Sequence, residues 1–187
     1  MWRPGFPYRE RATALVRGLH RRLCVVSRHH RGTVARPGLV MGLDRGGACR
    51  GVAYRVAADD VAATLDYLDE REIAHYSAYR RAEVTVALDT AAPSRAGVRA
   101  GVRTRAITYT VDRRDADYAG ALTVAQQAAL VAGAAGLSGS NPDYVAAAVA
   151  HIRELGLRDR RLEAVLACLE GQPSDQGRRN TSSTGTL

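Results

Sequence analysis

The sequence has no lysine and no long apolar run. All 27 of its basic residues are arginine, and with 19 acidic residues the formal net charge is +8. The arginines are spread along the chain, and the lack of lysine beside abundant alanine, glycine and valine is typical of a GC-rich coding bias. We therefore predict no nucleic-acid partner, although the charge leaves a basic nucleic-acid-binding module open as an alternative.

Cysteine and the usual site motifs are also scarce. Cys24, Cys49 and Cys168 are too few and too far apart for a disulfide framework or a CxxC metal site, which favours a reducing, cytoplasmic setting. His29 and His30 would point to opposite faces of an extended segment, so we predict no metal site. The sequence has no phosphate-binding GxxxxGK[ST], HExxH or GxSxG motif. No stretch predicts a membrane span, and the first residues lack the apolar centre of a signal peptide.

Composition divides the chain into one domain over residues 1–170 and a tail over residues 171–187. The tail is polar and rich in serine, threonine, glycine and asparagine, with almost nothing apolar to bury. We therefore predict that the tail is disordered. The remaining residues are enough for one domain with its own core.

Apolar periodicity predicts strands followed by helices. The strand patterns lie at 15–27, 38–43, 49–56, 83–88 and 106–111, and a helical turn is expected at 9–14. The second and third strands flank the glycine-containing turn at 44–47, so we expect them to pair as a hairpin. Helices are predicted from Asp59 to near Glu72, and from caps at Thr123, Asn141 and Asp159. This order indicates an α+β fold with an antiparallel or mixed sheet, with closure into a small barrel as one option.

An acidic cluster lies where the first predicted helix ends. Asp69, Glu70 and Glu72 are followed by a tyrosine-rich loop and then by the clearest strand pattern of the chain. A carboxylate at such an exit is held by the helix on one side and can face a cavity on the other. We predict that Glu72 is a proton-transfer group, and the alternative is a solvated helix end. Asp69 and Glu70 are weaker candidates, and we expect both to be ordinary helix-end charges.

Several segments resemble those of ChaC-type proteins, the glutathione-specific γ-glutamylcyclotransferases. They occur in the family's order and cover nearly the whole predicted domain: PGFPY at 4–8, HRG at 30–32, RPG at 36–38, GVAYRV at 51–56, YLDERE at 67–72, DYAG at 117–120 and SGSNPDY at 138–144. No single segment is specific, and the resemblance depends on their joint order and spacing.

The resemblance implies a small mixed β-barrel flanked by helices, and an enzyme that cleaves glutathione to 5-oxoproline and Cys-Gly without a cofactor. Its catalytic glutamate matches Glu72, while Tyr76, Tyr118 and Tyr144 match positions that line the pocket. Each of these tyrosines has a structural alternative as a buried phenol that ties loops together. A monomer is expected. Other γ-glutamyl amines as substrates, or a non-catalytic binding protein of the same fold, remain open.

One family feature is missing from the sequence. Members of the family have a first strand that ends in a YGSL-type loop, whose backbone N–H groups grip the γ-glutamyl group, and a tryptophan follows soon after. Trp2 matches that tryptophan and is therefore a candidate substrate-binding residue, but no YGS occurs in the sequence. We expect that residues 1–187 alone lack the first barrel strand and have little or no activity, because even one lost oxyanion donor costs about a hundredfold or more in rate.

Overall fold

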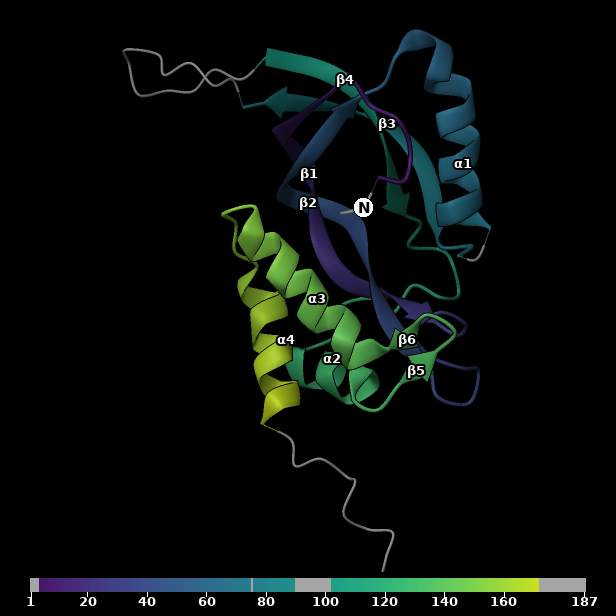
Figure 1. The fold of residues 1–187 in the computed structure, drawn as a ribbon. Coiled ribbons are helices and arrows are strands. Elements are labelled where there is room, and N and C mark those ends of the chain that lie inside the picture. Colours follow the sequence, from purple (N-terminus) through teal and green to yellow (C-terminus); the bar gives the residue numbers. More distant parts are fainter. Residues whose placement is uncertain (1–3, 75, 90–101, 172–187) are drawn as a thin grey trace, which may run out of the picture.

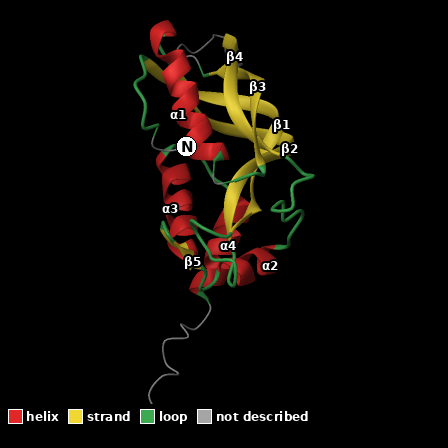
Figure 2. Ribbon diagram, turned by 90° about the vertical axis from the view of Figure 1, so that its right-hand side faces the viewer, coloured by secondary structure: helices red, strands yellow, loops and turns green. Residues whose placement is uncertain are grey.

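The computed structural model describes residues 4–74, 76–89 and 102–171. Within them the chain forms a four-stranded sheet in the order β2-β1-β3-β4, in which every pairing is antiparallel. Helix α1 packs beside β3 and β4 at one end of the sheet, and α2, α3 and α4 gather at the other (Figure 1). Seen from the side, α1 and α3 follow one another along the same side of the molecule (Figure 2). Trp2 and residues 172–187 of the predicted tail lie outside the described residues.

Two long strands form the backbone of the fold. Strands β1 (Glu10–Ser27) and β2 (Gly38–Arg55) pair along almost their whole length, with register shifts at Gly18 and at Cys24 of β1. The predicted helical turn at 9–14 is wrong, because β1 already begins at Glu10. The predicted hairpin is wrong as well: Gly46 and Gly47 have positive φ but lie within β2, opposite Gly18, and do not end the strand. Both halves of β2 pair with β1 and not with each other.

Strands β3 (Tyr79–Leu88) and β4 (Val102–Val111) form a second ribbon. Only Ala14–Val16 of β1 pair with Val86–Leu88 of β3, so the two ribbons meet over three residues and then diverge. The predicted α+β class and antiparallel sheet are confirmed. In the described residues no ladder joins β2 to β4, so the expected barrel is not closed. Instead, the side chain of Val111 on β4 packs against the backbone of β2 at Gly42, where an added Cβ atom would lie 2.1 Å from Val111 Cγ2.

The helices begin much as local sequence signals predict. They are α1 (Val61–Ile73), which follows the short 3-10 helix η1 (Ala58–Asp60), then α2 (Val124–Val131), α3 (Asn141–Glu154) and α4 (Arg160–Glu170). Thr123 forms a capping box with Gln126, and Asp159 caps α4 by accepting from the N–H of Leu162. At α3 the cap is Ser140 and not the predicted Asn141.

Asn141 has a different task. Its side-chain amide accepts from the N–H of Leu39 at 2.7 Å and donates to the C=O of Leu39 at 2.8 Å. Asn141 is fully buried, and this two-way bond joins the start of α3 to the start of β2. The two-residue strands β5 (Ala135–Gly136) and β6 (Gly139–Ser140) lead the chain into this contact.

The apolar core has two parts. One cluster packs α2, α3 and α4 against Leu23 and Leu39 of the long strands. The other fills the space between the ribbons and α1, and includes Cys24, Leu68 and Tyr79. All three cysteines are free, and burial, together with nearby Asp44, raises the pKa of the Cys24 thiol to about 12. Cys24 is therefore a packing residue and not a reactive thiol.

Candidate active site

Glu72 lies on the wall of a cavity of about 260 Å³ between the sheet and α3. The walls come from every strand of the sheet, from the last turn of α1 and from the C-terminal half of α3. Besides Glu72, the polar or reactive side chains of the walls are Arg21, Cys49, Arg50, Tyr79, Thr108, Tyr109 and His151. The sequence-based expectation that this helix exit faces a cavity therefore agrees with the geometry. The catalytic role of Glu72 stays a prediction.

Glu72 is lightly held. The Glu72 side chain is 22% exposed, and its carboxylate oxygen Oε1 lies 3.5 Å from Nε of Arg71. The same Arg71 donates to the C=O of Pro4 at 3.1 Å, which ties the N-terminal segment to α1. Within the described residues, Glu72 has no hydrogen bond beyond this ion pair. A carboxylate with one loose partner at a cavity wall can accept and return a proton without first breaking a network.

The neighbouring acidic residues differ from Glu72. Asp69 accepts from the Tyr109 hydroxyl at 2.5 Å and from Arg81 at 2.7 Å, so it fastens α1 to β3 and β4. Glu70 is exposed on the outer face of the helix. We predicted that both are ordinary helix-end charges, and for Asp69 the structure shows a more specific structural contact.

Tyr79 and Tyr109 also line the cavity, and neither was predicted from the sequence as a site residue. Tyr79 is buried and donates to the C=O of Met41 at 2.7 Å, and burial followed by the nearby Tyr144, Tyr76 and Glu72 raises its pKa well above the ordinary value. Burial and the hydrogen bond to Asp69 likewise raise the pKa of Tyr109. Both phenols therefore stay protonated at neutral pH. The alternating strand patterns around them were visible in the sequence, but their inward direction depends on pairing between β3 and β4.

The three tyrosines predicted as substrate-binding do not line this cavity. Tyr76 shares a hydrogen bond of 2.9 Å with Ser27, and its ring lies 5.4 Å from that of Tyr79. Tyr144 accepts from the N–H of Met41 at 3.1 Å, and burial raises its pKa to about 12. Tyr118 donates to Asp44 at 2.9 Å. In this structure each phenol joins segments of the fold, which is the structural alternative, and their substrate-binding role stays a prediction.

Asp44 is the most deeply buried charge near the cavity. Its side chain has no exposed surface, and it accepts from Arg113 at 2.6 Å and lies 3.6 Å from Arg22. Burial alone would raise the pKa of Asp44, but hydrogen bonds from Arg113, Tyr118 and the N–H of Arg45 lower it below the ordinary value. Asp44 thus joins β1, β2 and the loop after β4, just beyond the β2 residues that line the cavity.

Arginine supplies the positive charge of the cavity. Nη2 of Arg21 donates to the C=O of Arg50 at 2.6 Å and to the sulfur of Cys49 at 3.3 Å, and Nη1 lies 3.9 Å from Asp159. These contacts fix the guanidinium across β2, at the wall of the cavity. The cavity therefore offers a proton-transfer carboxylate, protonated phenols and a positioned cation.

The described residues contain neither a cluster of metal-binding side chains nor a membrane-spanning helix. They contain no group of three or more histidine, cysteine, aspartate or glutamate side chains that could hold a metal ion. None of the helices in this part of the chain has the length and apolar character of a membrane span.

An antiparallel sheet with helices at both ends, and a carboxylate, two phenols and a guanidinium in one cavity, is an arrangement typical of an enzyme. The model of the ChaC-like protein family matches residues 1–172, and the chain belongs to this family. The glutathione-specific gamma-glutamylcyclotransferase of Escherichia coli is 28% identical over 170 residues, covering 91% of this chain and 69% of that protein. The human glutathione-specific gamma-glutamylcyclotransferase 1 is 32% identical over 147 residues, covering 78% of this chain and 62% of the relative.

The fold is shared with a solved structure. The crystal structure of a yeast gamma glutamyl cyclotransferase specific to glutathione superposes with a TM-score of 0.76 at 22% sequence identity, over 87% of this chain and 88% of that one. This confirms the γ-glutamyl cyclotransferase-like fold that the resemblance implied.

Proposed function

We propose that this protein is a glutathione-specific γ-glutamylcyclotransferase in which Glu72 is the general acid and base. Family membership and the names of the relatives supply the reaction class. The observation that carries the assignment to Glu72 is its position on the cavity wall, where Arg71 is its ion-pair partner among the described residues. The proposal includes a cytoplasmic, monomeric protein, with glutathione as its small-molecule substrate and no cofactor.

The reaction is an intramolecular aminolysis. The α-amine nitrogen of the γ-glutamyl group attacks its own γ-carbonyl carbon, the amide C–N bond breaks, and 5-oxoproline and Cys-Gly leave. Because nucleophile and electrophile belong to one molecule, the protein must hold the substrate folded on itself. Glu72 takes the proton that the attacking nitrogen loses and gives one to the departing amide nitrogen. One carboxylate is therefore enough.

Arg21 supports glutathione over simpler γ-glutamyl amines. The departing Cys-Gly part of glutathione carries a carboxylate, which a guanidinium binds well. Arg21 is held in place by Arg50 and Cys49 and shares the cavity with Glu72. A γ-glutamyl amine without this carboxylate would not use Arg21. We therefore assign Arg21 to substrate choice and Glu72 to the chemistry.

The test is release of 5-oxoproline from glutathione by the wild type and by Glu72→Gln. The assay uses this chain both alone and joined to the YGSL-type strand and loop of a family member. Glu72→Gln should lower kcat by about 10²–10⁴-fold, the usual contribution of general acid–base catalysis. Circular dichroism of both proteins checks that the variant is folded.

Asp69→Asn is the matched control on the same helix. It weakens the contacts to Tyr109 and Arg81 but leaves the cavity carboxylate, so the folded fraction should keep most of its activity. Unchanged turnover in Glu72→Gln would remove Glu72 from the mechanism. A folded extended chain that is inactive on glutathione and on other γ-glutamyl amines would overturn the enzyme assignment and favour a non-catalytic binding protein.

A further inference from the structure

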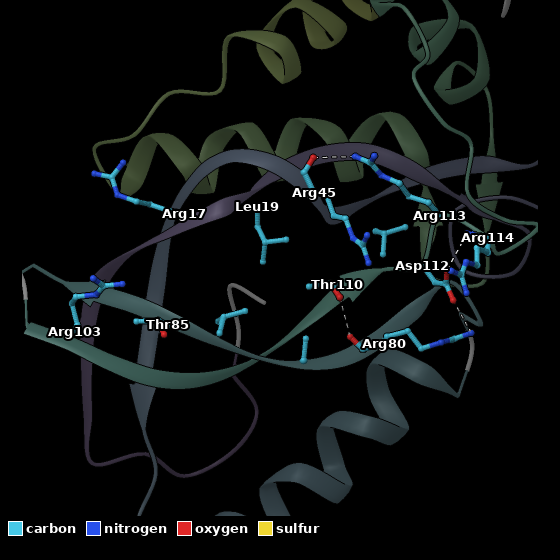
Figure 3. A pocket seen from close by; sticks show the side chains of 13 residues that line it. Arg17, Leu19, Arg45, Arg80, Thr85, Arg103, Thr110, Asp112, Arg113 and Arg114 are labelled. Carbon is cyan, nitrogen blue, oxygen red and sulfur yellow. Dashed lines mark hydrogen bonds and ion pairs between the residues drawn. The ribbon is translucent and has the colours of Figure 1, made fainter.

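A second cavity is larger than the one at Glu72 and separate from it. It has a volume of about 660 Å³ and lies between the β1–β2 ribbon and the β3–β4 ribbon (Figure 3). We call it the arginine slot, after the six arginines that line it: Arg17, Arg45, Arg80, Arg103, Arg113 and Arg114. Neither the proposed reaction nor the family comparison assigns it a role.

The slot opens where two strands separate. After Ala14–Val16 pair with Val86–Leu88, β1 and β3 make no further ladder in the described residues. The slot is therefore bordered by the parts of β1 and β3 just beyond this ladder, with Arg17 and Leu19 on β1 and residues 80–85 on β3, and no ladder joins the two strands there in the described residues. Exposed strand edges with unpaired N–H and C=O groups can pair with an additional strand.

The slot has an apolar middle and basic ends. Leu19, Ala82, Val84 and Val111 line it between the arginines. Arg17 and Arg103 lie at one end, Arg80, Arg113 and Arg114 lie at the other, and Arg45 extends from the middle toward this second group (Figure 3). Arg103 pairs with Ala87, seven positions along β3 from Arg80, which at about 3.3 Å per residue places the two ends about 23 Å apart.

Most of this positive charge has no internal partner. Arg80 pairs with Asp112 at 3.5 Å, and Arg113 pairs with Asp44 at 2.6 Å. The side chains of the other four arginines, Arg17, Arg45, Arg103 and Arg114, have no hydrogen bond or ion pair to any described residue. A ligand complementary to the slot is therefore acidic at both ends.

We propose that the arginine slot binds an extended peptide strand with acidic ends and alternate apolar side chains, inserted between β1 and β3. Backbone groups of the peptide complete the two open edges, its apolar side chains meet Leu19 and Val84, and its terminal carboxylates meet the two groups of arginines. A small anion such as pyrophosphate can occupy one end but cannot bridge a span of about 23 Å.

The probe is a blocked peptide of about seven residues, which reaches about 20 Å when extended. It has glutamate at both ends, two valines at alternate positions between them, and threonine elsewhere. The control peptide replaces both glutamates by lysine. Calorimetric titration of the 187-residue chain should show binding of the glutamate peptide that weakens as salt rises, and no binding of the lysine peptide. Hydrogen exchange should slow at the amides of Arg17, Leu19 and residues 80–85.

The variant Arg45→Glu/Arg103→Glu reverses one charge toward each end of the slot. It should weaken the glutamate peptide at least about tenfold. The control Arg9→Glu/Arg160→Glu makes the same change in net charge at exposed positions outside the slot, and should leave binding unchanged. Glutathione turnover should be the same in both variants, which separates this proposal from the proposed enzyme.

Three results would overturn the proposal. Equal binding of the lysine peptide would show that charge does not select the occupant. Pyrophosphate that binds as tightly as the peptide, with no slowing of exchange at the two strand edges, would show a small-anion site only. Concentration-dependent dimerisation lost in Arg45→Glu/Arg103→Glu would show that a second copy of the chain is the occupant.

Discussion

The two cavities of this protein are built from the same sheet and differ in how their polar groups are held. Around Glu72, the phenols of Tyr79 and Tyr109 and the guanidinium of Arg21 each have a hydrogen-bond partner within the fold. In the arginine slot, four guanidinium groups have none among the described residues. The fold holds these polar groups of the first cavity in place, whereas the second cavity has charge available for a partner. Asp44 lies between them, because it holds Arg113 of the slot and follows the cavity residues of β2.

The largest effect on this arrangement should come from Asp44→Asn. Removing one partner of a buried ion pair leaves Arg22 uncompensated, and such changes cost about 3–5 kcal/mol. Urea unfolding should show this loss in the free energy of unfolding. Asp112→Asn in the slot is the control: its pair with Arg80 is partly exposed, so it should cost less than about 1 kcal/mol. A similar loss in the free energy of unfolding for Asp44→Asn and Asp112→Asn would contradict the proposed difference between the Glu72 cavity and the arginine slot.

The lowered pKa of Asp44 also predicts how the stability of the fold depends on pH. Its pKa is lower in the folded protein than the usual value of about 3.9 in an unfolded chain. The carboxylate therefore stabilises the fold fully above about pH 3.9, and this contribution declines as the pH falls through the lower folded pKa. Wild-type stability should fall over this acidic range more steeply than that of Asp44→Asn. Parallel curves would show that Asp44 is not the group responsible.

A smaller effect is expected from Arg21→Gln. Losing a hydrogen bond to a charged group costs about 1.5–3 kcal/mol, so KM for glutathione should rise about 10–100-fold while kcat changes little. Turnover of a γ-glutamyl amine without a carboxylate should be unaffected. Arg17→Gln in the slot is the control and should leave KM for glutathione unchanged. A fall in kcat with constant KM would place Arg21 in the chemical step and not in substrate choice.

Gly42→Ala should have the smallest effect. The added Cβ would lie 2.1 Å from Val111 Cγ2, where the β2 and β4 sides of the sheet touch between the two cavities. Overpacking of this kind costs about 1–3 kcal/mol, which thermal unfolding can measure. Gly51→Ala is the matched control in the same strand, since a Cβ there meets nothing within 4 Å. Equal melting temperatures for the two variants would show that the contact adapts without cost.

The parts of the fold predicted from sequence are those that local chemistry decides. The capping residues Thr123 and Asp159 act within one turn of their helices, and α1 ends one residue after the predicted Glu72. Gly46 and Gly47 carried an equally strong turn signal, but the distant strand β1 pairs on both sides of them and makes them an irregularity within β2. The same limit applies to Asn141, whose partner Leu39 is 102 residues away.

The candidate site divides in the same way. The position of Glu72 at a cavity wall could be expected because the end of its helix is a local sequence signal, whereas its catalytic role stays a prediction. Tyr79 and Tyr109 could not be expected there, because their direction into the cavity follows from the register of β3 against β4. Asp69 was underestimated because its partners, Tyr109 and Arg81, lie on strands that follow it in the chain.

The bond between Asn141 and Leu39 has a consequence beyond joining α3 to the sheet. Strand β2 is an edge strand, and an edge with free N–H and C=O groups can recruit strands from neighbouring molecules. The amide of Asn141 uses both groups of Leu39, just as a residue of a further strand would. One side chain thus terminates the sheet at this point and protects the start of β2 from aggregation.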